Sequence, residues 1–354
     1  MRIGLIAPPA VPVPPPAYGG TESVVDLLAR GLVDAGHDVV LSAASNSTCP
    51  VPQLAGGPRA AAGAPVCADT VTELRHVVRS YAAFADAHVD VVHDHTLAGP
   101  LCRRPRDGTP VMTTAHGPFN AELAPLYRAM HGASVVAISR HQASTATGVD
   151  IAAVIHHGID VDAVPVGRGD GGYASFLGRM CPEKGPRQAA LIARAAGVPL
   201  RMAAKLREPA EREYFETAVR PLLGGDIEFL GELGSVDKLA LIGGSCALVN
   251  PLQWDEPFGL VMVEALASGT PVVATMSGSA PEIVDDGVTG FLRTGIRPMA
   301  AALLEAVDLD RAACRTSAVE RFSADRMVAE HLRLYQALAT DTLSARRGAR
   351  PVAV

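Results

Sequence analysis

Residues 249–275 read VNPLQWDEPFGLVMVEALASGTPVVAT, and this stretch decides the fold. One apolar run ends near Asn250, a polar loop passes through Pro257, and a helical segment begins at about Phe258 to Gly259 before the next apolar run. This order predicts a strand, a loop, a helix and a second strand, as in the βαβ units of parallel sheets. Such sheets bind ligands outside the carboxyl ends of their strands. The loop that carries Glu256 is therefore predicted to lie at a binding edge.

The start of this predicted helix is a candidate anion site. The first N–H groups of a helix have no partner within it, so those of Phe258, Gly259 and Leu260 point outward. Gly259 has no side chain, which lets a phosphate approach the backbone closely. Glu256 in the loop and Glu264 two turns into the helix suit paired sugar or ribose hydroxyls, because each carboxylate offers two acceptor oxygens. Two glutamates among 37 acidic residues mean little alone, but the order of strand, loop, glycine and helix favours a diphosphate and sugar site.

A second candidate anion site lies in FLGRMCPEKG, residues 176–185. Arg179 follows a predicted strand, and Lys184 stands at the start of the next helix. Arginine offers a planar fork to phosphate oxygens and lysine a point charge, which together suit a diphosphate leaving group. The alternative is a solvated loop in which Glu183 pairs with a neighbouring base. We favour the phosphate site.

Apolar runs bounded by Gly, Pro and Asp alternate with longer amphipathic segments along the whole chain. The runs are apolar throughout, as expected for strands of a parallel sheet that is covered on both faces. Those in the first half are IGLIA, HDVVLSA, VDVVHDH, TPVMTTAH, ASVVAIS and AAVIHH. Those in the second half are YASFLGR, PLRMAA, DIEFLGE, CALVN and TPVVAT.

The domain organisation follows from this alternation. A chain of 354 residues is too long for one comfortable core, and the pattern restarts after the Gly-rich segment Val166–Gly172, the candidate linker. The sequence predicts an α/β protein with two Rossmann-like domains and parallel sheets. The predicted parts are an N-terminal domain (1–166), a second domain (167–322), a terminal helix (323–340) and a frayed tail (341–354).

Two charged segments are predicted to be solvated helix faces. In TESVVDLLARGLVDAG, charged residues recur at every fourth position while valine and leucine turn inward, and Gly36 is placed as a C-cap. The charged positions are Glu22, Asp26, Arg30 and Asp34. The run LREPAEREYFE, residues 206–216, has the same interpretation.

Glycines and histidines supply further candidates in the first half. Gly19 and Gly20 precede a helix, so they form either an ordinary turn or a backbone contact to a diphosphate. His93 and His95 share one face of a strand, because alternate residues point the same way. They are either hydrogen-bonded structural histidines or groups on an acceptor side, and without a clear third ligand they argue against a metal site. His116 stands at a similar strand end.

Composition excludes several partner classes. Net charge is −6 and aromatics are 4%, which argues against nucleic-acid binding. The six scattered cysteines favour reduced thiols, the first apolar run is too short for a signal peptide, and no segment approaches a spanning helix. The acidic balance also argues against membrane contact through Arg75 and Arg79. We expect a soluble cytoplasmic protein.

The string EPFGLVMVEALASGTPVV resembles the E-x₇-E signature of retaining glycosyltransferases of the GT-B fold, family four. Other landmarks of that family occur in the same order: YGGTESVV, VAISRHQ, VIHHGIDVD, FLGRMCPEKG and SAPEIVDDGVTGFL. Two departures stand out. His157 occupies a position where the family usually has Asn, and SGSAPEI replaces the commoner Gly-Gly-x-P-E.

The resemblance implies a retaining, metal-independent hexosyltransferase without a cofactor, which uses a UDP- or GDP-linked sugar and a hydroxyl acceptor. It implies an N-terminal acceptor-side domain and a donor-binding second domain with a donor cleft between them. It also implies a final helix that crosses back to the N-terminal domain. Leaving diphosphate would assist the incoming hydroxyl on the same face of the sugar. The implied roles are sugar orientation by Glu256, a sugar contact by His116, ribose binding by Glu264, diphosphate binding by Arg179 and Lys184, and base recognition by backbone around Gly231 to Leu233.

Three alternatives remain at this point. A GT-B sugar-nucleotide epimerase would form product without an acceptor. A bilobal sugar-binding protein would normally carry a signal peptide. A nicotinamide oxidoreductase would need a Gly-rich fingerprint after its first strand, where Pro8 to Pro16 has none.

Overall fold

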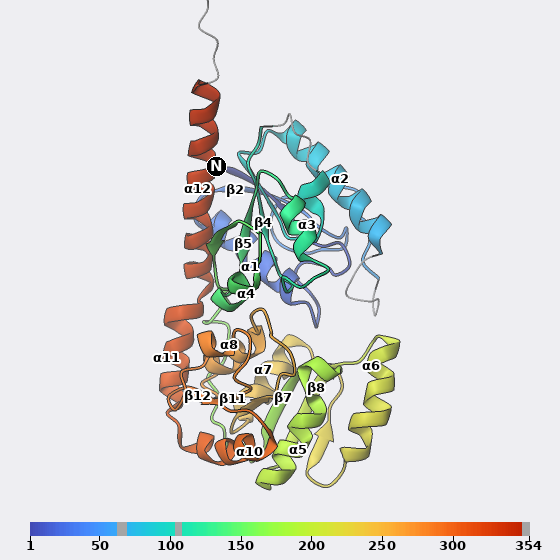
Figure 1. Cartoon of the computed structure of the whole chain (residues 1–354), viewed down its shortest axis with the longest axis vertical. Helices are drawn as coiled ribbons and strands as arrows, with labels where there is room; N and C mark the ends of the chain where they lie inside the picture. The colour runs from blue at the N-terminus through green and yellow to red at the C-terminus, as the bar shows by residue number, and fades with distance from the viewer. Residues whose placement is uncertain (62–68, 103–107, 349–354) are drawn as a thin grey trace, which may run out of the picture. The chain divides into compact units, whose positions relative to one another are not determined.

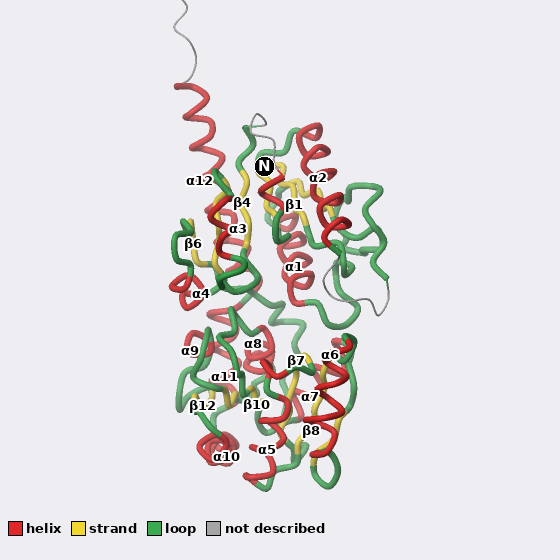
Figure 2. The backbone as a smooth tube through the Cα atoms, turned by 45° about the vertical axis from the view of Figure 1, so that its right-hand side comes forward, coloured by secondary structure: helices red, strands yellow, loops and turns green. Residues whose placement is uncertain are grey.

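The computed structural model describes residues 1–61, 69–102 and 108–348, and it divides into two units (Figure 1). Unit 1 contains Met1–Pro15, Gly19–Gly158 and the chain from Ala324 onward. Unit 2 contains Pro16–Tyr18 and Ile159–Ser323. In each unit the strands form an inner layer and helices lie outside it (Figure 2).

Within the described part of unit 1, six parallel strands form one sheet in the order β2-β1-β3-β4-β5-β6. Ile3 and Leu5 of the central strand have no exposed surface. The strands are β1 (Arg2–Ile6), β2 (Asp38–Ser42), β3 (Val91–Asp94), β4 (Val111–Thr114), β5 (Ala133–Ala137) and β6 (Ile151–Val154). The helices are α1 (Gly20–Asp34), α2 (Thr70–Ala87), the 3-10 turn η1 (Gly99–Cys102), α3 (Ala124–Ala129), α4 (Arg140–Thr145) and α12 (Ala324–Gly348).

Within the described part of unit 2, a second sheet of six parallel strands has the order β12-β11-β10-β7-β8-β9. Its strands are β7 (Ala174–Arg179), β8 (Leu200–Lys205), β9 (Ile227–Phe229), β10 (Leu248–Asn250), β11 (Val272–Ala274) and β12 (Gly290–Leu292). The helices are α5 (Pro186–Ala196), α6 (Pro209–Tyr214), α7 (Ser235–Gly244), α8 (Leu260–Ala267), α9 (Ala280–Ile283), α10 (Ile296–Glu305) and α11 (Arg311–Phe322). Short turns are η2 (Pro182–Lys184), η3 (Phe215–Val219), η4 (Arg220–Leu222) and η5 (Ala306–Asp308).

The two predicted parallel sheets are thus confirmed, and eleven of the strands were read from apolar runs. The sequence analysis missed β12, a short strand that pairs with β11 from Gly290 to Leu292. A built Cβ at Gly290 would lie 2.0 Å from the carbonyl oxygen of Val272, so the pairing requires glycine there. In sequence this glycine looks like part of a turn rather than a strand.

The unit boundary lies at Gly158–Ile159 instead of Val166. Ile159 N–H donates to the carbonyl of Phe322 at 2.9 Å, which ties it to unit 2. The Gly-rich segment is also part of unit 2, because Gly169 N–H donates to Gly243 at 3.0 Å. A side chain at Gly167 would meet the backbone of Gly243. These glycines allow close backbone packing, and the predicted linker Val166–Gly172 lies within unit 2 rather than between the units.

The predicted solvated face of α1 was wrong in its first two turns. Glu22 and Asp26 are 3% and 6% exposed. Asp26 accepts a hydrogen bond from the Arg30 guanidinium at 2.9 Å and lies beside the Cys49 thiol. The segment that follows β2 therefore covers charged side chains of α1 that the four-residue spacing predicts to be exposed. Gly36 follows the helix with a φ of 82°, as its predicted capping role requires.

The last helix belongs to unit 1. A built Cβ at Gly31 of α1 would lie 2.5 Å from Val328, so α1 and α12 pack closely. The helix continues to Gly348, beyond the predicted start of a tail, and residues 349–354 lie outside the described part. No helix among the described residues is long and apolar enough to cross a membrane.

Candidate functional site

The strand order of unit 2 defines a topological switch point. From β7 the chain adds β8 and β9 on one side, then returns to add β10, β11 and β12 on the other. The loops that leave β7 and β10 therefore diverge, which is where ligands bind in α/β sheets. Arg179 is the last residue of β7 and Asn250 the last of β10. The predicted phosphate loop and the predicted Glu256 loop follow these two strands.

The structure brings Lys184 and Glu256 together at this switch point. The Lys184 ammonium forms an ion pair with the Glu256 carboxylate. The indole Nε1 of Trp254 donates to the same carboxylate at 2.8 Å, and the ammonium lies 5.4 Å from the centre of the Trp254 ring. The side chains of Lys184 and Glu256 are only 15% and 13% exposed. Glu256 is therefore a fixed, enclosed group and not a solvated loop residue.

Arg179 differs from Lys184 in its partners. Arg179 is a partly exposed residue, and its guanidinium forms no ion pair with any residue that the structure describes. Tyr18 lies nearby: burial raises the pKa of its phenol to about 12, while Arg179 lowers that pKa and Glu256 raises it. The switch point therefore holds one paired and one unpaired cation, which suits a ligand with negative charge.

The loop that carries Glu256 is held by the segment that departs from the family pattern. Ser277 Oγ donates to the Asp255 carboxylate at 2.6 Å, and Gly278 N–H donates to it at 3.1 Å. Ser279 N–H donates to the carbonyl of Glu256 at 3.0 Å, and the Ser279 hydroxyl donates to Phe258. A Cβ at Gly278 would clash with the Glu256 backbone. The SGSAPEI segment thus supplies its own hydrogen bonds to this loop.

Helix α8 begins at Leu260, with Gly259 as its N-cap in the left-handed region at a φ of 98°. The N–H groups of Gly259 and Leu260 donate no hydrogen bond within the described part of the chain. The Phe258 ring is buried and packs against Phe322, with centroids 6.0 Å apart. Further along α8, the Glu264 carboxylate accepts a hydrogen bond from the Lys238 ammonium at 2.6 Å. The N–H groups of Gly259 and Leu260 therefore have no described partner, and an anion site at this helix start stays a prediction.

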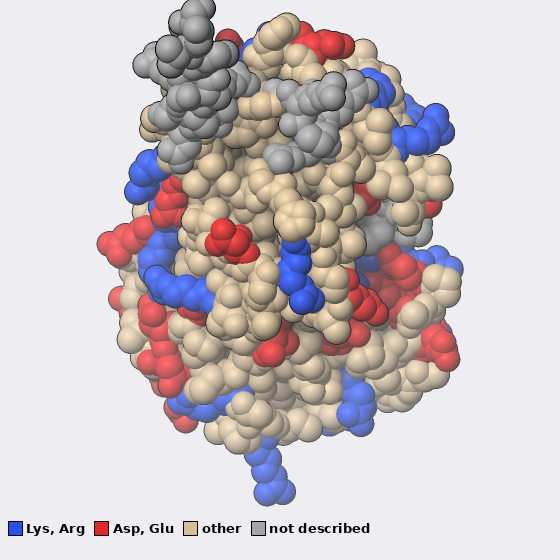
Figure 3. Space-filling model, turned by 45° about the horizontal axis from the view of Figure 1, so that its top comes forward, with Lys and Arg blue, Asp and Glu red and all other residues tan. Residues whose placement is uncertain are grey.

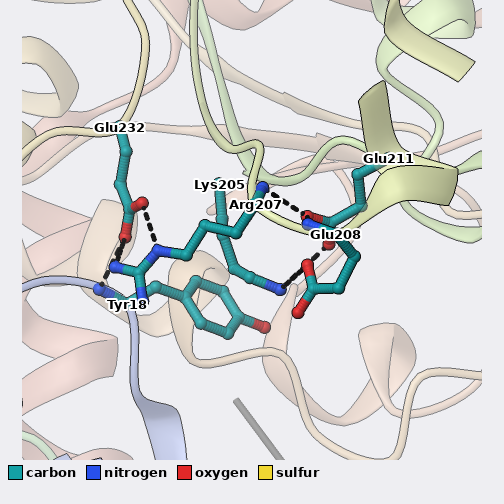
Figure 4. A network of polar contacts seen from close by, with 6 residues as sticks. All are labelled: Tyr18, Lys205, Arg207, Glu208, Glu211 and Glu232. Carbon is teal, nitrogen blue, oxygen red and sulfur yellow. Dashed lines mark hydrogen bonds and ion pairs between the residues drawn. The ribbon is translucent and has the colours of Figure 1, made fainter. Parts of the chain in front are cut away.

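A buried charge network follows β8, where the sequence analysis predicted a solvated helix face (Figure 4). The Lys205 ammonium donates to Glu208 at 2.5 Å and to Glu211 at 3.0 Å, and its side chain is 2% exposed. Arg207 forms two hydrogen bonds with Glu232, at 2.9 and 2.6 Å. The prediction was wrong for Glu208 and Glu211, whose carboxylates turn back onto Lys205 at the strand end. It holds for the exposed Arg212, Glu213 and Glu216.

Tyr18 belongs to this network. Its backbone N–H donates to Glu232 at 3.3 Å, and its ring lies with its centre 5.7 Å from the Lys205 ammonium (Figure 4). The predicted base-reading segment from Gly231 to Leu233 contains Glu232 and follows β9. The sequence analysis missed Lys205, although a lysine at the end of an apolar strand is a usable signal, like Arg179 at the end of β7.

Unit 1 has its own switch point, between β1 and β3. The loop after β1 leads to Gly19 and Gly20, and α1 begins at Gly20. A built Cβ at Gly19 would lie 3.0 Å from the Glu22 carboxylate. Burial raises the pKa of Glu22 to about 7. A carboxyl group with a raised pKa therefore lies beside the predicted diphosphate contact.

Three histidines of unit 1 lie at the carboxyl ends of the neighbouring strands β3 and β4: His93, His95 and His116. His93, the most enclosed, has no exposed surface, and its ring nitrogens bond Tyr335 at 2.7 Å and Thr114 at 2.8 Å. His95 Nδ1 and His116 Nε2 lie 2.9 Å apart. His93 is thus a hydrogen-bonded core histidine, and direct acceptor contact by it would require its neighbours to move. No cluster of three or more metal-ligating side chains occurs among the described residues.

Cysteines and surface charge complete the description. The cysteines that the structure describes are free thiols: Cys49, Cys102, Cys181, Cys246 and Cys314. Cys67 lies outside the described residues. On the face in Figure 3, Lys and Arg side chains are interspersed with Asp and Glu, and the described part of that face shows no continuous basic stripe.

Comparison with known proteins identifies the family. The model for glycosyl transferases group 1 matches residues 167–308, and the model for Glycosyltransferase Family 4 matches residues 18–163. Together these matches span most of the chain. The chain belongs to the family-four glycosyltransferases.

Individual relatives agree with this assignment. The glycosyltransferase is 28% identical to the phosphatidyl-myo-inositol mannosyltransferase of Mycolicibacterium smegmatis, over 95% of this chain and 94% of that protein. It matches the crystal structure of AviGT4, a glycosyltransferase involved in avilamycin A biosynthesis, with 26% identity, a TM-score of 0.74 and coverage of 96% and 98%. Anabaena HepE in complex with UDP and glucose shares the fold, at 19% identity, a TM-score of 0.74 and coverage of 95% and 99%. The fold is therefore GT-B.

Within this glycosyltransferase, unit 2 contains most of the predicted donor residues. Arg179 ends β7, whereas Lys184 and Glu256 lie in the segments that follow β7 and β10, and Glu264 lies on α8. Gly19, Gly20 and the three histidines belong to unit 1.

Proposed function

We propose that this glycosyltransferase moves a hexosyl group from a nucleoside-diphosphate sugar to an acceptor hydroxyl, with retention of anomeric configuration and without a metal or other cofactor. Arg179 gives the main support for this proposal. It is half-buried beside the enclosed Lys184–Glu256 pair, and its guanidinium has no ion-pair partner in the described chain. A diphosphate satisfies this arrangement, because two cations and the start of α8 then face its charge.

The roles follow from the chemistry of each group. Arg179 and Lys184 stabilise charge that grows on the diphosphate as the bond from the anomeric carbon to its oxygen breaks. The electron pair stays with that oxygen, the acceptor hydroxyl bonds to the anomeric carbon on the same face, and its proton passes to the diphosphate. When the diphosphate replaces Glu256 as the ion-pair partner of Lys184, the Glu256 carboxylate orients the sugar hydroxyls. Glu264 binds ribose, and His116 contacts the sugar.

Donor and acceptor classes are proposed from the relatives. HepE carries UDP and glucose, which supports a UDP-linked donor, and a GDP-linked donor is the second choice. The mannosyltransferase named for phosphatidyl-myo-inositol supports an inositol-like polyol as acceptor, and a glycan is the second choice. Acidic net charge and free thiols favour a cytoplasmic enzyme with a small-molecule acceptor. The epimerase and binding-protein alternatives gain no support from the comparisons.

The test is a transfer assay with UDP-glucose, UDP-N-acetylglucosamine and GDP-mannose, each with and without myo-inositol or a short glycan, in the presence of EDTA. We expect release of nucleoside diphosphate that depends on an acceptor, and proton NMR of the product should show the anomeric configuration of the donor. Release of an epimerised sugar without acceptor would instead establish the epimerase. Inverted product, or turnover abolished by EDTA, would overturn the proposed mechanism.

A further inference from the structure

The hydrogen bond between His95 and His116 constrains both rings. His95 Nδ1 and His116 Nε2 lie 2.9 Å apart, so one nitrogen carries the proton and the other accepts it. Burial, followed by the charge of His331, lowers the pKa of His116 to about 3, and burial lowers the pKa of His95 well below its usual value. Both rings are therefore neutral at pH 7, and the shared proton selects a tautomer for each.

The other nitrogen of His95 decides between the two arrangements. His95 Nε2 is buried and has no hydrogen-bond partner among the described residues. If His116 were the donor, His95 would carry its proton on this Nε2, as a buried N–H without an acceptor. Such orphaned N–H groups are rare in native proteins. If His95 donates from Nδ1, Nε2 is only an unused lone pair.

A second histidine fixes the plane of the His116 ring. His157 stacks on it with centroids 5.1 Å apart and an interplanar angle of 23°. His116 is the partly exposed member of the group, and its Nδ1 is not among the enclosed polar atoms that lack a partner. The ring is thus held at one nitrogen and on one face, and its Nδ1 is left for a ligand.

We propose that His95 is a positioning residue for His116: it donates Nδ1–H to His116 Nε2 and thereby keeps the His116 proton on Nδ1. His116 then donates a hydrogen bond to an oxygen atom of the bound sugar, and it does not act as the base that takes the acceptor proton. The sugar contact rests on the proposed function, whereas the tautomer does not. The inference also gives a structural role to His157, the departure from the family's usual Asn.

The first experiment measures the tautomer directly in the full chain without any substrate. Protein with ¹⁵N-labelled histidine is studied by long-range ¹H–¹⁵N correlation at pH 7.5, with His116→Gln for assignment. We expect a pyrrole-type shift at His116 Nδ1 and a pyridine-type shift at Nε2. The opposite pattern in the wild type would overturn the proposal, whatever the enzyme's activity.

The second experiment separates positioning from a merely structural role. His95→Leu removes the donor at similar volume, and we expect kcat to fall about 10–100-fold with little change in donor KM. His95→Asn places an amide N–H where Nδ1 stood and should restore kcat to within about threefold. His331→Leu, in the same buried cluster but without a hydrogen bond to His116, is the matched control and should keep wild-type kcat.

The outcomes distinguish this inference from the function on which it rests. If the tautomer is as expected but neither His95→Leu nor His116→Gln changes kcat, the sugar contact of His116 is wrong. If His95→Asn is as impaired as His95→Leu while His116→Gln is also impaired, the positioning role of His95 is wrong.

Discussion

Units 1 and 2 have the same six-stranded parallel architecture, yet the side chains at their switch points differ in kind. In unit 1 the edge carries buried imidazoles whose pKa values are lowered by burial, and they bond hydroxyls and one another. In unit 2 it carries lysine–glutamate ion pairs and the Arg179 guanidinium, which has no ion-pair partner among the described residues. The same fold thus presents neutral hydrogen-bonding groups at the switch point of unit 1 and charged groups at the switch point of unit 2.

The difference matches the two halves of the proposed reaction. A leaving diphosphate needs positive charge that is already in place, which unit 2 supplies with Arg179 and Lys184. Hydroxyl groups of a sugar and an acceptor need neutral donors and acceptors, which unit 1 supplies with imidazole nitrogens. The same contrast predicts that unit 2 depends on its ion pairs, whereas unit 1 depends on keeping its histidines unprotonated.

The largest expected effect is on the stability of unit 2. Lys205→Met leaves the buried Glu211 carboxylate without its ion-pair partner, and we expect the free energy of unfolding to fall by about 3–5 kcal/mol. Urea unfolding followed by the fluorescence of Trp254 measures this free energy. Trp254 is the one tryptophan of the chain and belongs to unit 2. Arg220→Met, which breaks an exposed pair with Glu216, should cost less than about 1 kcal/mol. Equal midpoints for the two variants would contradict the buried network.

The next largest effect is on catalysis. Arg179→Ala removes a cation without stranding a described partner, so turnover should fall about 100–1000-fold while the melting temperature changes little. Arg187→Ala, at an exposed position on α5, is the control and should retain activity. Steady-state release of nucleoside diphosphate measures both. Turnover by Arg179→Ala within threefold of wild type would remove this residue from the diphosphate site.

A smaller effect concerns acid stability of unit 1. Burial lowers the pKa of His331 to about 4, so its stabilisation is complete above about pH 6.5 and is lost as pH falls toward 4. Between pH 7.5 and 4.5, the free energy of unfolding of His331→Leu should therefore fall by about 2–3 kcal/mol less than that of wild type. The pKa values of Asp94 and Glu22 are raised to about 6 and 7, so these carboxyl groups favour the folded state as pH falls. This opposing effect is the same in wild type and in His331→Leu.

Hydrogen exchange of the β3 amides measures this difference, because α12 packs against that strand. Exchange of the β7 amides in unit 2 provides the internal reference. Parallel pH profiles of β3 in wild type and His331→Leu would show that the imidazole does not govern the acid sensitivity of unit 1.

The smallest effect tests the loop that carries Glu256. Ser277→Ala removes hydrogen bonds to Asp255 and to the carbonyl of Trp254, which contribute about 1 kcal/mol. We expect kcat/KM to fall up to about tenfold, with a changed Trp254 emission because this residue lies on the same loop. Unaltered kcat/KM and emission would mean that the serine does not hold the loop in solution.

Sequence reasoning succeeded where the signal was local. The apolar runs located most strands, and the order of strand, loop, glycine and helix located Glu256 and the start of α8. It failed where contacts distant in sequence decide the outcome. The bond from Ile159 to Phe322 sets the unit boundary, and the carboxylate of Glu211 makes Lys205 a buried charge. Glu22 is buried although its helical spacing assigns it to solvent.

The central claim is that a nucleoside diphosphate binds at the charged switch point of unit 2. The most direct measurement is a thermal-shift panel with UDP, GDP, ADP, dTDP and NAD, on wild type and on Glu264→Ala. A ligand that binds only the folded state raises the melting temperature. We predict that one nucleoside diphosphate stabilises the wild type and that this shift disappears in Glu264→Ala. A shift with NAD alone, or a nucleotide shift that survives in Glu264→Ala, would contradict the claim.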